Sequence, residues 1–153
     1  MADLLVPLYG LRDVLVPHCH EIRRPMASEG TLLQEWVSRS FGEGWASEIL
    51  PGLSRTPPTV MLAVESGAMS PAGFCAWDCT ALGFLGPVGV LESSRGDGIG
   101  GALVLSVLHE MARQGYGYAV IGGVGPVRFF QKVCGAVEIQ GSTPGIYGKR
   151  LRW

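Results

Sequence analysis

The chain has 153 residues, of which 47% are hydrophobic and 16% charged, and its formal net charge is −1. This length suits one domain with a buried core, and the composition excludes an intrinsically disordered chain. The small net charge argues against a protein that binds nucleic acid or membrane surfaces. We therefore expect a single domain over residues 1–153.

The cysteines and apolar segments bear on the compartment. The cysteines form no C-x-x-C pair, so reduced thiols in a cytoplasmic protein are expected. The first residues, "MADLLVPLYGLRD", lack the basic and apolar segments of a secretory signal. The longest apolar run, at 81–91, contains Pro87 and is too short for a membrane helix. Residues with metal-binding side chains lack the ligand spacing of a zinc site, so no metal is expected; they are His18, Cys19, His20, Cys75 and Cys79.

The first half of the chain predicts one strand, two helices and a hairpin. Residues 3–9 are strand-like, with Pro7 indicating an edge position. Residues 31–41 place apolar side chains on one helical face, and Thr31 and Gln34 have capping-box spacing. Trp45 and Ile49 predict a second short helix, and the stretch 51–58 is expected to stop helical structure. Strands at 59–65 and 72–78 then form a hairpin.

The second half predicts a strand–helix–strand unit followed by a helix and a hairpin. A buried strand at 81–91 precedes a glycine-rich loop, and the helix after it begins near Ile99 and stops at Gly115. With the strand at 118–124 this forms a right-handed crossover with parallel strands. Pro126 opens a helix over 126–133. Strands at 136–140 and 146–151 form a terminal hairpin.

The loop "LESSRGDGIGGALV" at 91–104 fits three motifs. Arg95-Gly96-Asp97 spells an adhesion tripeptide, but it lies between a buried strand and an amphipathic helix. The G-x-G-x-x-G pattern of dinucleotide-binding folds needs an acidic residue at the end of the next strand, which ends instead in "VIGGV". A Walker A loop needs a Lys-Ser/Thr pair, which is absent here.

The third motif, R-x-x-G-x-G, predicts a phosphate-binding loop at the start of a helix. The glycines let successive backbone amides turn toward one anion without interference from a Cβ atom. The helix adds its dipole and its unpaired amides. Arg95 supplies positive charge, and Asp97 is expected to point outward.

Together, "GPVGVLE", the glycine loop with its helix, and "VRFFQKVCGA" resemble the GNAT superfamily of acetyl-CoA-dependent N-acetyltransferases. The resemblance covers about residues 59–147 and is sharpest over 88–135. It implies an α/β (α+β) fold: a mixed, mostly antiparallel central sheet with one parallel strand–helix–strand crossover and helices on both faces. It also implies acetyl transfer from acetyl-CoA to a primary amine of a small molecule or a peptide. A catalytically silent coenzyme A-binding module is the alternative, and homodimerisation stays open.

The resemblance also implies which residues contact the cofactor. The loop that would bind the pyrophosphate comprises Arg95, Gly96, Asp97, Gly98, Ile99, Gly100 and Gly101. The main chain of the preceding strand would pair with the pantetheine arm through Val88, Gly89 and Val90, and the amide of Val90 could stabilise the carbonyl oxygen. The side chains expected at the thiol end are Phe130 and Gln131.

The catalytic residues are less clearly indicated. Phe130 stands where the family carries a thiol-protonating tyrosine. Tyr147 or a water could replace it, or the thiolate could leave unprotonated, since thiol pKa values lie near 8.5. Glu92 and Asp78 are candidates for the general base; alternatively, Glu92 favours the helix N-terminus and Asp78 forms a turn. Trp36 and Trp45 lie where the family walls its acceptor pocket, and aromatic walls suit an amine cation.

Overall fold

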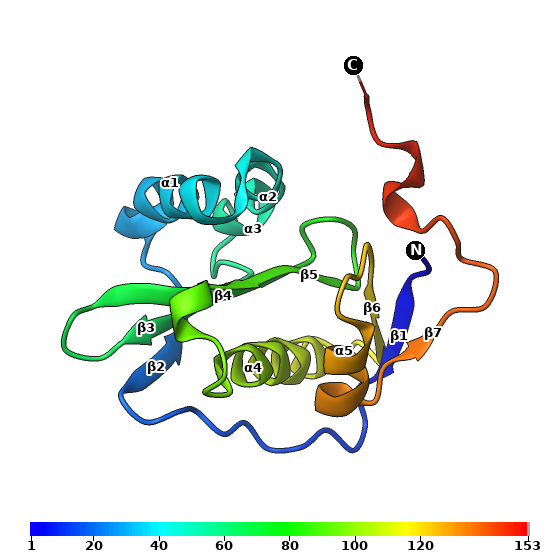
Figure 1. Ribbon diagram of the computed structural model, residues 1–153, viewed down its shortest axis with the longest axis horizontal. Helices are drawn as coiled ribbons and strands as arrows, with labels where there is room; N and C mark the ends of the chain where they lie inside the picture. The colour runs from blue at the N-terminus through cyan, green and yellow to red at the C-terminus, as the bar shows by residue number, and fades with distance from the viewer. Residues whose placement is uncertain (153) are drawn as a thin grey trace.

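A computed structural model describes residues 1–152, which form a seven-stranded sheet in the order β2-β3-β4-β5-β6-β1-β7 (Figure 1). All neighbouring strands are antiparallel except β5 and β6, which are parallel. The strands are β1 (Leu4–Pro7), β2 (His20–Arg23), β3 (Val60–Glu65), β4 (Ser70–Trp77), β5 (Phe84–Val90), β6 (Tyr118–Ile121) and β7 (Val137–Glu138). The mixed, mostly antiparallel sheet is therefore confirmed.

Helices cover both faces of this sheet (Figure 1). One face carries α1 (Gly30–Phe41), α2 (Glu43–Glu48) and α3 (Leu50–Leu53), and the other carries α4 (Ile99–Arg113) and α5 (Val127–Cys134). Each layer has its own core. Leu33 and Val37 of α1 pack with Phe74, whereas Leu103 and Val107 of α4 belong to the larger cluster on the opposite face. No helix within residues 1–152 combines the length and apolar character that crossing a membrane requires.

The predicted crossover is confirmed, because β5 and β6 are parallel and α4 connects them. The hairpin of β3 and β4 is also confirmed. Gly115, with a φ of 102°, follows the end of α4 as expected. These elements come from local signals, namely apolar periodicity, glycines and a short turn.

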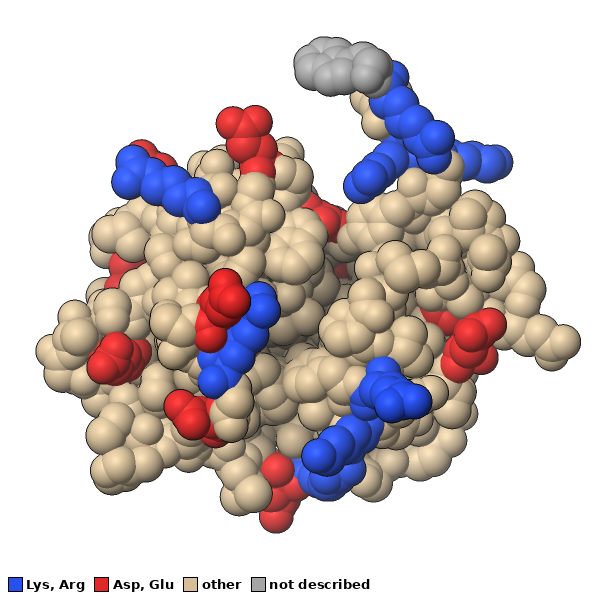
Figure 2. Space-filling model, viewed as in Figure 1, with Lys and Arg blue, Asp and Glu red and all other residues tan. Residues whose placement is uncertain are grey.

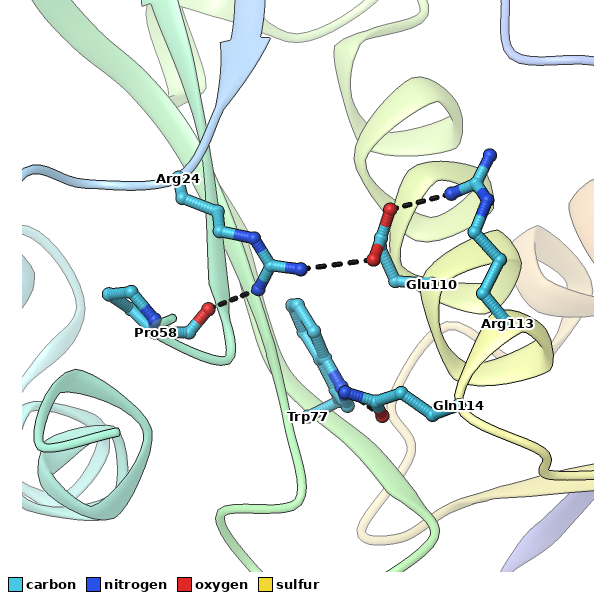
Figure 3. A network of polar contacts seen from close by, with 6 residues as sticks. All are labelled: Arg24, Pro58, Trp77, Glu110, Arg113 and Gln114. Carbon is cyan, nitrogen blue, oxygen red and sulfur yellow. Dashed lines mark hydrogen bonds and ion pairs between the residues drawn. The ribbon is translucent and has the colours of Figure 1, made fainter. Parts of the chain in front are cut away.

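A polar network fastens α4 to the sheet near the end of the helix that lies away from the glycine loop (Figure 3). Arg24, just past β2, forms an ion pair with Glu110 at 3.0 Å and donates to the carbonyl of Pro58. Its guanidinium lies 5.1 Å from the centre of the Trp77 ring, and the Trp77 indole donates to Gln114 at 3.1 Å. Partly buried charges paired in this way hold their partners in one arrangement.

The helix ends differ from the expectation in two places. Thr31 and Gln34 do not cap α1, because the chain enters through a 3-10 helix, η1 (Ala27–Glu29). The Glu29 carboxylate instead accepts the Met26 amide at 2.7 Å. Helical structure also does not stop at residue 51, since α3 includes Pro51 in its first turn, where a proline costs no hydrogen bond.

The predicted edge position of the first strand is wrong. β1 lies between β6 and β7, and Pro7 pairs with Tyr118. On the other side β7 pairs only with Leu4 and Leu5, so the missing amide of Pro7 interrupts no ladder there. The true edge on the far side of the sheet is β2, which was not predicted.

The predicted terminal hairpin is also wrong. Only β7 is a strand, it pairs with β1, and residues 146–149 form a 3-10 helix, η3 (Ile146–Lys149). Asp3 secures this C-terminal segment: its amide donates to Ser142 Oγ at 2.8 Å, and its carboxylate accepts the Ile146 amide at 3.3 Å. Because β1 occupies the place beside β6, the segment leaves the sheet and runs past the end of β6.

Candidate active site

The strands β5 and β6 separate in the middle of the sheet. Their last pair is Leu85 with Ile121. Against β4, the β5 register changes by one residue between Leu85 and Val88, which places a bulge at Gly86–Pro87. A bulge bends a strand and ends regular pairing. The edge of β5 beyond Pro87 is therefore open on the side of β6, and we call the point of separation the vertex.

The polar main-chain groups along this open edge can be assigned from the register. The Leu91 amide donates to the Ala72 carbonyl of the β4 side at 2.9 Å. In a strand, the main-chain N–H and C=O groups of neighbouring residues point to opposite sides. Those of Gly89 therefore also face β4, whereas those of Val88 and Val90 face the opening. The Val90 carbonyl accepts Arg95 Nε at 3.2 Å. Of the three predicted pantetheine contacts, two thus present main-chain groups to the opening.

Gly89 has a packing role as well. A Cβ atom there would lie 2.8 Å from Cε1 of Phe41, so the absence of a side chain lets the α1 ring rest on the strand. This close approach brings an aromatic surface directly over the open edge.

The glycine loop has the geometry expected of an anion-binding loop. Gly96 and Gly98 have φ values of 95° and 88°, and Gly98 precedes α4. The first helix amide that donates to a carbonyl four residues earlier is that of Ala102, which donates to the Gly98 carbonyl at 3.0 Å. Within the described chain, the amides of residues 96–101 donate no hydrogen bond. Ile99 is only 1% exposed, so it can offer its amide but not its side chain; Asp97 is exposed. The loop and the open edge therefore fit a phosphate followed by an extended, amide-bearing chain.

Helix α5 borders the loop through a residue that the sequence reasoning missed. Phe129 lies 3.2 Å from the position of a Cβ atom on Gly100, and it packs edge-to-face on Phe130 at 5.0 Å. Phe130 itself is 3% exposed and belongs to the core. Its ring therefore offers almost no surface to a ligand, contrary to the expectation, whereas Gln131 is exposed.

Three segments bring a carboxylate and two hydroxyls together. The Tyr147 hydroxyl donates to Glu48 Oε1 at 2.5 Å, and the Thr80 hydroxyl donates to the same oxygen at 2.5 Å. Burial and the Glu48 carboxylate raise the pKa of Tyr147 to about 12. We call these three residues the carboxylate cluster.

The carboxylate cluster lies at the vertex. Gly123 follows the last β6 pair by two residues, and a Cβ atom on it would lie 2.7 Å from the Tyr147 ring. Only a glycine leaves room for that ring. Glu48 comes from α2, so the cluster is on the face of the sheet opposite α4. In Figure 2 the surface is hollowed between the α1–α2 layer and the C-terminal segment, and acidic atoms are visible in the upper part of this hollow.

Comparison with known proteins identifies the architecture. No family model matches the chain, and no curated protein matches it. A GCN5-related N-acetyltransferase from Sphaerobacter thermophilus superposes with a TM-score of 0.71 at 21% identity, over 90% of this chain and 48% of that one. This chain has the GNAT fold.

Two further GNAT structures agree. A GNAT family acetyltransferase from Brucella melitensis in complex with acetyl-CoA has a TM-score of 0.56 at 24% identity, covering 74% of this chain and 82% of its own. A tandem GNAT protein from the clavulanic acid biosynthesis pathway has a TM-score of 0.59 at 16% identity, covering 90% and 49%. The chain thus spans about half the length of the Sphaerobacter and tandem structures.

Within this GNAT fold, neither of the two acidic residues predicted as bases belongs to the carboxylate cluster. Asp78 Oδ1 accepts the Gly83 amide at 2.7 Å and the Tyr116 hydroxyl at 2.9 Å, so Asp78 closes the turn between β4 and β5. Glu92 is exposed in η2 (Glu92–Ser94), beyond the far end of β5 from the vertex. These contacts agree with the alternative in the sequence analysis, in which Asp78 forms a turn.

Glu48 was missed because no local pattern marks it. The only sequence signal was its position one turn after Trp45, which was assigned to the acceptor side. The histidines and cysteines that the sequence analysis considered as zinc ligands do not form a metal site. Among the described residues, no group of three or more His, Cys, Asp or Glu side chains could hold a metal ion.

Proposed function

We propose that this protein is an acetyl-CoA-dependent N-acetyltransferase in which residues 1–153 form one catalytic domain acting on a primary amine. The observation that carries the proposal is the continuous path from the glycine loop, along the open edge of β5, to the carboxylate cluster at the vertex. The GNAT fold and the acetyl-CoA complex of the Brucella relative support it. The four free cysteines support a cytoplasmic location.

The residues of this chain fit the cofactor in two parts. The amides of residues 96–101 and the Arg95 guanidinium would hold the pyrophosphate, since unpaired amides at a helix start favour an anion. The main-chain groups of Val88 and Val90 would pair with the pantetheine arm as an added strand pairs with a sheet edge. When bound there, acetyl-CoA supplies the activated acetyl thioester.

Glu48 is the residue that we assign as general base. A protonated amine cannot attack a thioester, so a group at the vertex must accept its proton. Thr80 and Tyr147 both donate to Oε1 of Glu48, which orients the carboxylate and leaves Oε2 for the amine. We assign the stabilisation of the carbonyl oxygen to the amide of Val88 in place of the predicted amide of Val90, because Val88 faces the opening next to the bulge and so lies nearer the vertex.

Tyr147 serves better as a positioning residue than as an acid. A phenol with a pKa of about 12 is a poor proton donor to a thiolate whose acid has a pKa near 8.5. Its hydroxyl instead remains protonated at neutral pH and holds Glu48. The thiolate then leaves unprotonated or takes a proton from water.

The test combines calorimetry of acetyl-CoA binding with release of free thiol in the presence of a panel of amines. Binding and amine-dependent thiol release are expected. Arg95→Glu should weaken acetyl-CoA binding about 10- to 100-fold, the range for a lost charge-assisted contact. Arg39→Glu makes the same charge change on α1 and should not alter binding. Absence of acetyl-CoA binding would refute the proposal, and binding without thiol release for every amine would favour the silent module.

A further inference from the structure

We propose that the acceptor is a primary amine carried on an aromatic or alkyl body, of the arylalkylamine class, and not an amino sugar or a hydroxylated amine. The inference rests on the proposed function and specifies the acceptor side of the same site. It follows from the surroundings of the carboxylate cluster, which combine one available carboxylate oxygen with exposed apolar side chains.

The cluster offers one position for an ammonium group. Both hydroxyls donate to Oε1 of Glu48, and Oε2 accepts no hydrogen bond from residues 1–152. An ammonium group carries three N–H donors, and its bond to a carboxylate is among the stronger hydrogen bonds in proteins. The nitrogen of the acceptor is therefore placed at Glu48 Oε2.

Each of the three segments that build the cluster also carries a large exposed apolar side chain close in sequence to its cluster residue. Trp45 lies one turn before Glu48 on α2 and is 38% exposed; Leu82 follows Thr80 in the same loop and is 75% exposed; Ile146 precedes Tyr147 and is 37% exposed. Each residue of the cluster thus has a large exposed apolar neighbour from its own segment. Exposed apolar side chains beside a polar site are typical of surfaces that bind an apolar ligand.

An aromatic surface extends from α2, which carries Glu48, to the open edge of β5. The Trp45 ring lies 5.7 Å from that of Phe41, with 32° between the planes, and Phe41 rests on Gly89. A ligand ring can stack on this surface, and an ammonium group is attracted to the face of an indole. The hydroxyls of a sugar would lose their hydrogen bonds to water there without gaining partners.

The test uses two amines with the same two-carbon chain, 2-phenylethylamine and ethanolamine, which differ in a phenyl group against a hydroxyl group. Calorimetry should show 2-phenylethylamine binding at least about 10-fold more tightly, because burial of a phenyl group stabilises the complex. Trp45→Ala should remove most of this preference, and Glu48→Gln should weaken both amines. Tyr9→Ala is the matched control: Tyr9 is 69% exposed and contacts Tyr118 at the opposite end of β6.

The outcomes separate this inference from the proposed function. Equal binding of the two amines, no binding of either, or an unchanged preference in Trp45→Ala overturns the inference. Selective binding of 2-phenylethylamine without thiol release from acetyl-CoA overturns the proposed function and supports the acceptor class. Thiol release that is as efficient with ethanolamine or glucosamine as with 2-phenylethylamine supports the function and overturns the acceptor class.

Discussion

Gly123→Ala should both destabilise the protein and disturb the carboxylate cluster. Gly123 has a φ of 62°, and an added Cβ atom would lie 2.7 Å from Cδ2 and Cε2 of Tyr147. The ring must then move away from Glu48. An alanine in the left-handed region costs about 1–2 kcal/mol, whatever its surroundings. Loss of the Tyr147–Glu48 bond, which is only half-buried, adds about 1–2 kcal/mol, toward the lower end for hydrogen bonds to charged groups.

A matched glycine separates these two contributions. Gly135 has a φ of 66°, and a Cβ atom there would have no neighbour within 4 Å. Gly135→Ala should therefore lower the free energy of unfolding by about 1–2 kcal/mol, and Gly123→Ala by about 2–4 kcal/mol. Urea-induced unfolding followed by fluorescence measures both. In a Tyr147→Ala background, Gly123→Ala should cost no more than Gly135→Ala, because the ring is already absent.

Activity provides a second readout of the same change. Displacement of Tyr147 leaves Glu48 with only one of its two orienting donors, Thr80, so acetyl transfer should slow while the affinity for acetyl-CoA stays unchanged. If Gly123→Ala and Gly135→Ala destabilise the wild-type chain equally, the contact between Gly123 and the Tyr147 ring is not as described, and the assignment of Tyr147 fails with it.

Three further changes test other parts of the structure. The Arg23 guanidinium lowers the pKa of Glu29 from 4.5 to about 2. The contribution of the Arg23–Glu29 pair to stability is therefore present above pH 4.5 and is lost as the pH falls toward 2. Glu29→Gln should therefore destabilise by about 1 kcal/mol at pH 7 and by less at pH 2–3, as measured by urea unfolding; an equal effect at both pH values would contradict this. Gly89→Ala should lower stability by about 1–3 kcal/mol, because its Cβ atom collides with the Phe41 ring, and a thermal unfolding temperature unchanged from wild type would show that the ring is not held there. In single-turnover kinetics, Glu48→Gln should slow acetyl transfer about 10²- to 10⁴-fold, whereas Glu92→Gln should leave it unchanged; the reverse order would return the base to Glu92.

The elements that form the proposed cofactor side of the site could be predicted from the sequence because their signals are local. Glycines at 96 and 98 are required by positive φ values within the loop itself. The apolar spacing after Ile99 predicts α4, and a strand, a helix and a second strand in succession predict a parallel crossover whatever the rest of the chain does.

The position of Phe130 shows where such reasoning stops. The motif placed a side chain on α5 but could not tell which face of that helix meets the sheet. The core takes Phe130, and Phe129 meets the start of α4 instead. Helix α5 has eight residues and two adjacent phenylalanines, so packing against the sheet, and no sequence pattern, decides which of the two rings is buried.

By itself the sequence determined the strand, the glycine loop, the helix and the parallel strand that build the proposed cofactor side, because each depends on residues adjacent in the chain. Only the tertiary structure brought together the carboxylate cluster, which we propose as the catalytic side. The insertion of β1 between β6 and β7 sends the C-terminal segment past the vertex, and this brings Tyr147 to a carboxylate 99 residues earlier and to a hydroxyl 67 residues earlier. Contacts over such separations follow from how the layers pack, and no local pattern of residues encodes them.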